Sequence, residues 1–301
     1  MKTIFIDCNP QLGAVWQRVY RPDDPAVTIN TTPFEKNELP GVIGDYEVAI
    51  DDHSYMPTDL VRQCKNLKHI VFLGTGAASY MNVAELEAAG RKVHTIKGYG
   101  DTAVAEQTIA LMMAACRDLA LMDRNIRAGT WATREGVQLF GKTLGIIGLG
   151  GIGSEVARIA RGLGMQVIGW NRTKRADAHV TTVELDDLLQ RSDVISINLT
   201  LNDETRGFLD KTRIARMKPG VIFINTARGA LVDEAALMDA LKSGHIRHAG
   251  LDVFHNEPLK AGDPLAGVEN VTLSAHAAFR TLEASMTLLR RAIDIVKQVQ
   301  S

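Results

Sequence analysis

The sequence has little of what marks secreted, membrane-spanning or nucleic-acid-binding proteins. Its three cysteines stand alone at positions 8, 64 and 116, without the pairing expected of a disulfide framework or a zinc site, so reduced thiols are expected. Its 34 lysines and arginines are balanced by 35 aspartates and glutamates, which leaves no positive field to attract nucleic acid or an anionic membrane. No uncharged apolar run reaches the length of a membrane span. We therefore expect neither a nucleic-acid partner nor a membrane partner.

Two further absences concern targeting and metals. Only four apolar or small residues lie between Lys2 and Asp7, too few for a signal peptide, so a cytoplasmic location is expected. The eight histidines show no H-E-x-x-H or comparable ligand spacing, so no metal site is predicted. The chain has 301 residues, 46% of them hydrophobic, which is enough to bury a core and to form two domains.

A glycine-rich motif is the most informative feature of the chain. An apolar run at residues 144–147 leads into Gly148-Leu149-Gly150-Gly151-Ile152-Gly153, which opens a helix-like stretch. The first glycine permits a tight strand-to-helix turn, Gly150 lets the backbone approach a pyrophosphate, and Gly153 lets the helix pack close to its strand. The helix N-terminus then faces the phosphate charge. An ordinary glycine turn is the alternative, but the order of strand, turn, helix and strand favours dinucleotide binding.

The residues after the next predicted strand bear on which dinucleotide is bound. That strand ends at Asn171, where an NAD-selective site usually has an acidic residue that holds the ribose hydroxyls. An acidic side chain would repel a 2′-phosphate, whereas Arg172, backed by Lys174 or Arg175, pairs with one through charged hydrogen bonds. With Thr173 between them, these residues favour NADPH over NADH. A solvated basic turn beside a permissive asparagine is the alternative interpretation.

Short apolar runs predict strands in both halves of the chain. In the first third the predicted strands are 3–7, 46–50, 69–73 and 92–96, and residues 83–89 are helix-like, which indicates a small α/β domain. After Gly141 the predicted strands are 144–148, 166–170, 194–199, 221–225 and 248–252, each followed by a helical stretch. Such alternation calls for a parallel sheet with helices on both faces, a Rossmann-type doubly wound sheet.

Two helical segments lie outside this alternation. Residues 102–121 are apolar on most faces, more than a single exposed helix would be, which suggests burial at a subunit interface. The last segment carries one apolar stripe, so we expect an amphipathic helix that packs back onto the N-terminal domain. The stripe consists of Leu282, Met286, Leu289, Ile293 and Val296.

Three residues have side chains suited to the chemistry that accompanies hydride transfer. Arg228 follows the predicted strand 221–225, at the carboxyl end where open α/β sheets bind ligands, and its guanidinium can bind a carboxylate with two hydrogen bonds. His276 and Glu257 follow later apolar stretches, so an acid and the group that orients it would meet there. Taken singly, each is better explained as a salt bridge, a loop charge or a core histidine. Taken together in this order, they favour catalysis.

These motifs resemble the D-isomer-specific 2-hydroxyacid dehydrogenase family, from about Leu67 to Glu283. The segments that carry the resemblance, in the family's order and spacing, are Asp203-Glu204-Thr205-Arg206-Gly207, Met217-Lys218-Pro219-Gly220, Asn225-Thr226-Ala227-Arg228-Gly229, Leu251-Asp252-Val253-Phe254, Glu257-Pro258-Leu259 and His276. The resemblance implies a Rossmann-type dinucleotide-binding domain at residues 99–277. It also implies a smaller flavodoxin-like α/β substrate domain at residues 1–98 and 278–301, and a homodimer.

The resemblance also implies roles for individual residues. Arg228 is similar to the family's substrate-binding arginine, Glu257 to the carboxylate paired with the catalytic histidine, and His276 to that histidine. Thr75 and Gly76 resemble the loop whose backbone N–H groups hold the substrate carboxylate, a simple strand-ending turn being the alternative. With the motif residues included, the expected cofactor-binding residues are Thr102, Gly148, Gly150, Gly151, Ile152, Gly153, Asn171, Arg172, Thr173, Lys174, Thr226, Ala227 and Asp252.

The expected activity is NADPH-preferring reduction of a small 2-oxo acid, such as glyoxylate or hydroxypyruvate, to the D-2-hydroxy acid. The alternatives are a 3-phosphoglycerate dehydrogenase-like enzyme and a non-catalytic dinucleotide-sensing protein of the same fold, because fold alone does not decide function. Phe279 departs from the small residue that the family usually has there. It either narrows the substrate pocket or packs inward against the last helix, and the sequence favours neither.

Overall fold

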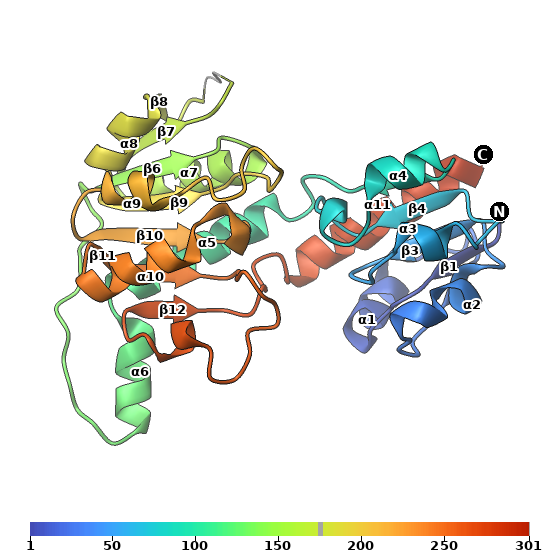
Figure 1. The fold of residues 1–301 in the computed structure, drawn as a ribbon, viewed down its shortest axis with the longest axis horizontal. Coiled ribbons are helices and arrows are strands. Elements are labelled where there is room, and N and C mark those ends of the chain that lie inside the picture. The colour runs from blue at the N-terminus through green and yellow to red at the C-terminus, as the bar shows by residue number, and fades with distance from the viewer. Residues whose placement is uncertain (174–176, 301) are drawn as a thin grey trace. The chain divides into compact units, whose positions relative to one another are not determined.

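The computed structural model describes residues 1–173 and 177–300, which form two compact units. Unit 1 comprises Met1–Gly100 and Arg280–Ser301, and unit 2 comprises Asp101–Phe279. Each unit is built on one parallel sheet with helices on both faces (Figure 1). The α/β class and the two parallel sheets predicted from the sequence are therefore confirmed. Lys174 and Arg175 of the predicted basic turn lie outside the described residues.

Unit 2 carries a seven-stranded sheet in the order β12-β11-β10-β9-β6-β7-β8. Its strands are β6 (Thr143–Ile147), β7 (Gln166–Trp170), β8 (Thr181–Thr182), β9 (Val194–Ile197), β10 (Val221–Asn225), β11 (Ile246–Leu251) and β12 (Val271–Leu273). The direction in which the chain adds strands reverses between β6 and β9. Open α/β sheets bind ligands at such a reversal, beyond the carboxyl ends of the strands.

Side chains alternate between the two faces of this sheet. In β10, Val221 and Phe223 join a core with α8 (Leu185–Arg191), α9 (Lys211–Ala215) and α10 (Glu234–Ser243). Ile222 and Ile224 join a second core with α5 (Asp101–Cys116) and α7 (Gly151–Gly162). Because successive strand residues point to opposite faces, a continuous apolar run is what a strand covered on both sides needs. Unit 2 also contains α6 (Leu119–Arg127), η3 (Gly229–Leu231) and η4 (Pro264–Gly267).

Unit 1 has a five-stranded sheet in the order β2-β1-β3-β4-β5, which is the flavodoxin-like order. Its strands are β1 (Thr3–Phe5), β2 (Val27–Ile29), β3 (Val48–Asp51), β4 (His69–Phe72) and β5 (Lys92–Thr95). Its helices are α1 (Pro10–Val19), α2 (Leu39–Ile43), α3 (Thr58–Val61), α4 (Val83–Ala88), α11 (Leu282–Gln300), and the short η1 (Lys36–Glu38) and η2 (Ala77–Ser79). The C-terminal helix α11 buries Leu289, Ile293 and Val296 in one core with Phe5 of β1 and Trp16 of α1.

The helix predicted over residues 102–121 is interrupted, so that prediction is wrong in its extent. Helix α5 ends at Cys116, α6 begins at Leu119, and Asp118 between them has a φ of 51°, a left-handed conformation in which a helix cannot continue. The Asp118 carboxylate lies 2.9 Å from Nδ1 of His248. This partner on β11 stabilises the break, and local sequence gives no sign of it.

Strands β2 and β8 were not expected from the sequence. Both are edge strands of two or three residues, and β8 is fully exposed, so neither has the apolar run that predicts a strand. Within the part of the chain that the structure describes, every helix is too short or too polar to cross a lipid bilayer. A cytoplasmic location stays a prediction.

An ion pair anchors α11 within unit 1 and gives a testable pH dependence. The guanidinium of Arg290 contacts the buried Asp24 carboxylate at 2.6 and 2.8 Å, and hydrogen bonding to Arg290 lowers the pKa of Asp24 to about 2, although burial opposes the shift. A folded-state pKa below the unfolded value means stability that is present above about pH 4 and is lost as the pH falls through about 2.

Asp24→Asn is therefore expected to destabilise unit 1 by about 2 kcal/mol at neutral pH, measured by urea unfolding. The difference from the wild type should shrink as the pH is lowered from 5 toward 2. Asp294→Asn is the matched control, because Asp294 contacts the same arginine but is 60% exposed. Equal effects of the two substitutions would contradict the assignment of this stability to the ion pair between Asp24 and Arg290.

Candidate active site

The glycine motif forms the turn between β6 and α7. Gly148 has a φ of 100°, and a β-carbon there would lie 2.6 Å from the carbonyl oxygen of Asn198, just after β9. A β-carbon at Gly153 would lie 2.1 Å from the carbonyl oxygen of Gly148, whereas one at Gly150 would meet nothing within 4 Å. The turn is thus closely packed at Gly148 and Gly153, whereas the space next to Gly150, at the N-terminus of α7, is open. This geometry fits a dinucleotide pyrophosphate, which backbone N–H groups and the helix dipole stabilise.

The first turn of α7 also contacts the beginning of α5. A β-carbon at Gly151 would lie 1.8 Å from Oδ2 of Asp101, so the carboxylate occupies the space that a side chain at position 151 would need. Ile152 follows in the same turn, and Thr102 follows Asp101 with its side chain exposed. Two residues expected to bind the cofactor, Gly151 and Thr102, therefore lie on neighbouring helix N-termini.

Asn171 connects the end of β7 to the glycine turn. Its Oδ1 accepts a hydrogen bond from the Leu149 backbone N–H at 3.1 Å, and its Nδ2 donates to the Thr173 carbonyl oxygen at 2.7 Å. An aspartate at this position lacks the amide donor for the second bond. The neighbouring Arg172 forms an ion pair with Glu204, a residue to which the sequence assigned no role. Within the predicted basic turn, the guanidinium of Arg172 is therefore already paired with the carboxylate of Glu204.

Two further expected cofactor residues follow β10. The hydroxyl groups of Thr226 and Thr108 lie 2.8 Å apart in the interior, which ties the end of β10 to α5. The Ala227 backbone N–H donates to Oδ1 of Asn225 at 3.0 Å, and Nδ2 of Asn225 donates to the Arg228 carbonyl oxygen at 2.9 Å. This buried asparagine closes the turn that leads from the strand into Arg228.

His276 and Glu257 are in direct contact. Nδ1 of His276 lies 2.6 Å from Oε2 of Glu257, and the Phe254 backbone N–H donates to Oε1 of the same carboxylate at 2.8 Å. About a quarter of the His276 side chain is exposed. With Nδ1 bound to the carboxylate, Nε2 is the nitrogen available to a substrate, the orientation that a general acid needs.

The surroundings of Glu257 keep it ionised. Burial raises the pKa of its carboxyl group, but hydrogen bonds from His276 and from the Phe254 N–H, with the charges of His276 and Arg228, outweigh burial and leave the pKa below its ordinary value. A carboxylate that stays charged is a strong hydrogen-bond acceptor for Nδ1 of His276 and so fixes the orientation of the ring. The pair can thus present Nε2 to a carbonyl group that is being reduced.

Asp252 fixes the backbone that carries His276. Its buried carboxylate accepts hydrogen bonds from the Ala277 and Ala278 N–H groups at 3.0 and 2.9 Å and from the Ser274 hydroxyl at 2.5 Å, and its carbonyl oxygen accepts from the His276 N–H at 2.8 Å. His276 has a φ of 47°, a conformation that costs energy in a non-glycine residue. The four hydrogen bonds offset this cost, which makes Asp252 a positioning residue.

The hydrogen-bonding partners of Asp252 extend to α5. Nε2 of Gln107 donates to the Ser274 hydroxyl at 3.2 Å, so a residue in the middle of α5 supports the loop after β12. Neither Gln107 nor Ser274 was predicted from the sequence. The position of Ser274, two residues before His276, is the only local signal for its role.

Arg228 lies between the end of β10 and η3 and is half-buried. Its Nη1 donates to the Ala227 carbonyl oxygen at 2.6 Å, and its charge contributes to the low pKa of Glu257. Arg228, Glu257 and His276 thus occupy the carboxyl ends of β10, β11 and β12, which are neighbours in the sheet (Figure 1). The structure brings the three predicted catalytic residues to one edge of unit 2.

Two aromatic side chains flank this group. The Phe279 ring meets the His276 ring edge to face, with centroids 6.1 Å apart. The exposed His255 places Nε2 2.8 Å from the Val232 carbonyl oxygen, so a backbone group of another loop holds it. His255 is therefore engaged with the protein itself, as expected for a loop histidine without a catalytic role.

The expected substrate residues of unit 1 follow β4. Thr75 is exposed, and Gly76 directly precedes η2. The Ser79 backbone N–H donates to the Gly76 carbonyl oxygen at 3.0 Å, which closes the turn. The loop lies at the carboxyl end of a central strand of this sheet, the edge at which ligands bind in such folds.

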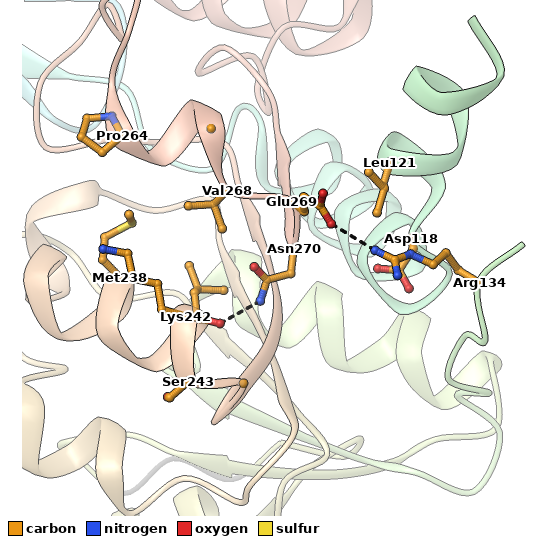
Figure 2. A pocket seen from close by; sticks show the side chains of 13 residues that line it. Asp118, Leu121, Arg134, Met238, Lys242, Ser243, Pro264, Val268, Glu269 and Asn270 are labelled. Atoms are coloured by element: carbon orange, nitrogen blue, oxygen red, sulfur yellow. Dashed lines mark hydrogen bonds and ion pairs between the residues drawn. The ribbon is translucent and has the colours of Figure 1, made fainter. Parts of the chain in front are cut away.

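A cavity of about 660 Å³ lies elsewhere in unit 2 (Figure 2). Two hydrogen-bonded contacts lie within its lining: Arg134 contacts Glu269 at 3.2 Å, and Nδ2 of Asn270 donates to the Leu241 carbonyl oxygen at 3.1 Å. Glu269 and Asn270 directly precede β12, so the cavity lies at the amino end of that strand. Among the described residues, no predicted catalytic or cofactor-binding residue lines it.

Comparisons with known proteins agree with this geometry. Residues 109–278 match the family described as D-isomer specific 2-hydroxyacid dehydrogenase, NAD binding domain. The chain is 32% identical to a hydroxypyruvate reductase of Blautia hydrogenotrophica, over 99% of this chain and 96% of that protein.

Solved structures show the same similarity. A glyoxylate reductase from Paecilomyes thermophila is 32% identical with a TM-score of 0.86, covering 99% of this chain and 95% of that one. An acyclic imino acid reductase in complex with NADPH and D-Arg is 27% identical with a TM-score of 0.88, covering 100% and 97%. The protein is an NAD(P)-dependent dehydrogenase. It belongs to the D-isomer specific 2-hydroxyacid dehydrogenase family.

Proposed function

We propose that this protein reduces a small 2-oxo acid of the glyoxylate or hydroxypyruvate class to the D-2-hydroxy acid, with NADPH as its preferred cofactor. The observation that carries the proposal is the contact of 2.6 Å between His276 and Glu257, at the edge of the sheet where the glycine turn also lies. An acid beside a dinucleotide site provides the proton that accompanies hydride transfer to a carbonyl carbon. The relatives named as hydroxypyruvate and glyoxylate reductases support the substrate class.

In this proposal each side chain has a separate task. The bound reduced cofactor supplies a hydride for C2 of the substrate. His276 donates its proton from Nε2 to the carbonyl oxygen, and Glu257 stabilises the imidazolium until that transfer. Arg228 binds the substrate carboxylate and polarises the ketone, and the N–H groups of Thr75 and Gly76 in unit 1 are assigned to the carboxylate by resemblance. In this proposal, the protein accelerates the reduction by electrostatic stabilisation and by positioning of the substrate.

The cofactor preference is proposed from the loop after β7. Asn171 uses its amide group to tie this loop to the glycine turn, so the position offers no carboxylate to hold the ribose hydroxyls. Arg172 beside it supplies a cation for the 2′-phosphate. The NADPH present in the structure of the imino acid reductase is consistent with this preference.

Initial rates test the function and the cofactor together. Purified protein is assayed with NADPH and with NADH against glyoxylate, hydroxypyruvate, pyruvate and phenylpyruvate. Faster turnover of glyoxylate or hydroxypyruvate with NADPH is the expected result, and faster turnover with NADH would overturn the cofactor preference alone. Cofactor binding without turnover of any acceptor would replace the proposal with a dinucleotide-sensing role.

A homodimer is part of this proposal, and exposed apolar side chains support it. Between Met113 of α5 and the start of β6, five large hydrophobic residues are exposed, and contact with a second copy would bury their apolar area. They are Met113, Leu119, Ile126, Trp131 and Phe140, exposed by 42%, 51%, 53%, 87% and 72%. Trp131→Glu is expected to weaken the dimer by at least about tenfold in sedimentation equilibrium, because Trp131 is the most exposed of these five residues and a buried tryptophan contributes strongly to an interface. A wild-type monomer would contradict the assembly without affecting the catalytic proposal.

A further inference from the structure

The ion pair between Arg172 and Glu204 joins two loops that flank the glycine turn. Arg172 follows β7 and Glu204 follows β9, and these strands lie on either side of β6 in the sheet. The loop after β9 also contacts the turn directly, because a β-carbon at Gly148 would lie 2.6 Å from the Asn198 carbonyl oxygen. The pair therefore bridges the reversal point of the sheet, where a dinucleotide lies in this kind of fold.

Both partners of this bridge are accessible. The Arg172 and Glu204 side chains are 74% and 70% exposed, so solvent and salt screen their attraction and little energy is needed to separate them. The loop that carries Glu204 is itself well ordered by hydrogen bonds. The Glu204 N–H donates to Oδ1 of Asn202 at 3.0 Å, and the Thr205 hydroxyl donates to the Thr200 carbonyl oxygen at 2.7 Å. The backbone thus keeps the carboxylate near the loop after β7.

We propose that Glu204 is a specificity-determining residue that competes with the cofactor's 2′-phosphate for Arg172 and so limits the preference for NADPH over NADH. This inference rests on the proposed assignment of Arg172 to that phosphate. A 2′-phosphate must displace the carboxylate from the guanidinium and then remains close to a like charge. The 2′-hydroxyl of NADH carries no such charge and needs no such exchange.

Glu204→Gln removes the competing charge and keeps the length of the side chain. The expected result is NADPH binding tightened by about fivefold, the upper range for an exposed ion pair, with NADH binding unchanged. The gain should diminish at high ionic strength, because salt already screens the carboxylate of the wild type.

The measurement is the dissociation constant of each reduced cofactor, from its fluorescence on titration with protein in the absence of any 2-oxo acid. The matched control is Glu269→Gln, which removes the same charge from another exposed arginine pair. Glu269 is 75% exposed and pairs with Arg134 (Figure 2). It precedes the edge strand β12, whereas the glycine turn follows β6, four strands away in the sheet. This control is expected to change neither constant.

Arg172→Gln and the double variant separate the two proposals. If Arg172→Gln weakens NADPH binding and the gain from Glu204→Gln disappears in its background, competition for Arg172 is supported. If Arg172→Gln weakens NADPH binding but Glu204→Gln changes nothing, or changes both cofactors equally, the inference on Glu204 fails and the cofactor assignment survives. If Arg172→Gln leaves NADPH binding unchanged, both fail.

Discussion

Replacing His276 with alanine is expected to lower kcat for 2-oxo acid reduction by about 10³-fold while NADPH binding changes little. The imidazole places Nδ1 2.6 Å from the Glu257 carboxylate, and in the proposed mechanism the other ring nitrogen donates the proton that the substrate oxygen receives. Without it, water must protonate the developing alkoxide. Single-turnover oxidation of NADPH, followed by absorbance, measures the loss at the chemical step directly.

Backbone conformation at this position calls for a second variant. His276 has a φ of 47°, which asparagine tolerates better than alanine, so His276→Asn preserves the loop and removes only the acid. The control is His255→Ala, because His255 contacts a backbone carbonyl group and has no proposed part in the reaction. Loss of NADPH binding in folded His276→Asn would contradict the assigned role, as would a comparable loss of kcat in His255→Ala.

The glycine turn and the alternation of strands and helices were predictable because they leave regular patterns along the chain. Gly148 and Gly153 are required by backbone contacts within a few residues of sequence or with the adjoining strand, and such requirements leave a recognisable spacing. The continuous apolar run of β10 follows from burial on both faces. Patterns of this kind can be recognised without knowing which distant residue makes the contact, as with Asn198 at Gly148.

The support of the catalytic loop was not predictable in the same way. The sequence predicts Asp252 as a cofactor-binding residue, and that role stays a prediction. The structure shows its carboxylate bonded to the Ser274 hydroxyl and to two backbone N–H groups. Those partners lie 22 to 26 residues further along the chain, and Gln107 is 167 residues from Ser274. Residue type and spacing carry no information on such contacts. The bridge from Arg172 to Glu204 escaped prediction for the same reason.

The predicted helix over residues 102–121 shows how a tertiary contact overrides a local pattern. Its apolar residues favour one continuous helix, and the structure instead has a break at Asp118, whose carboxylate binds His248 on β11. Burial lowers the pKa of His248 despite this carboxylate, which opposes it. The buried, neutral His248 thus stabilises the chain at Asp118, where α5 ends. This contact forms only when β11 is folded into the sheet, so the local sequence does not reveal it.

The second large effect is expected at Arg228. Arg228→Gln should lower kcat/KM for the 2-oxo acid by about 10²- to 10³-fold, with KM raised and kcat reduced, because the guanidinium both binds the carboxylate and stabilises charge in the transition state. Cofactor dissociation constants should stay within about twofold of the wild type, because the assigned contacts of Arg228 are with the substrate.

Arg228→Lys distinguishes charge from geometry. Lysine restores the positive charge but not the planar pair of donors that a carboxylate accepts, so recovery should be small. The charge of Arg228 also contributes to the low pKa of Glu257, and Arg228→Gln removes that contribution whereas Arg228→Lys retains it. Loss of this charge should raise the pKa of Glu257 and move the acidic limb of the pH–rate profile to higher pH in Arg228→Gln but not in Arg228→Lys. That result would show that the charge of Arg228 acts on Glu257. Full activity in Arg228→Gln would show that Arg228 has no part in the mechanism. Full recovery in Arg228→Lys would show that only its positive charge is needed.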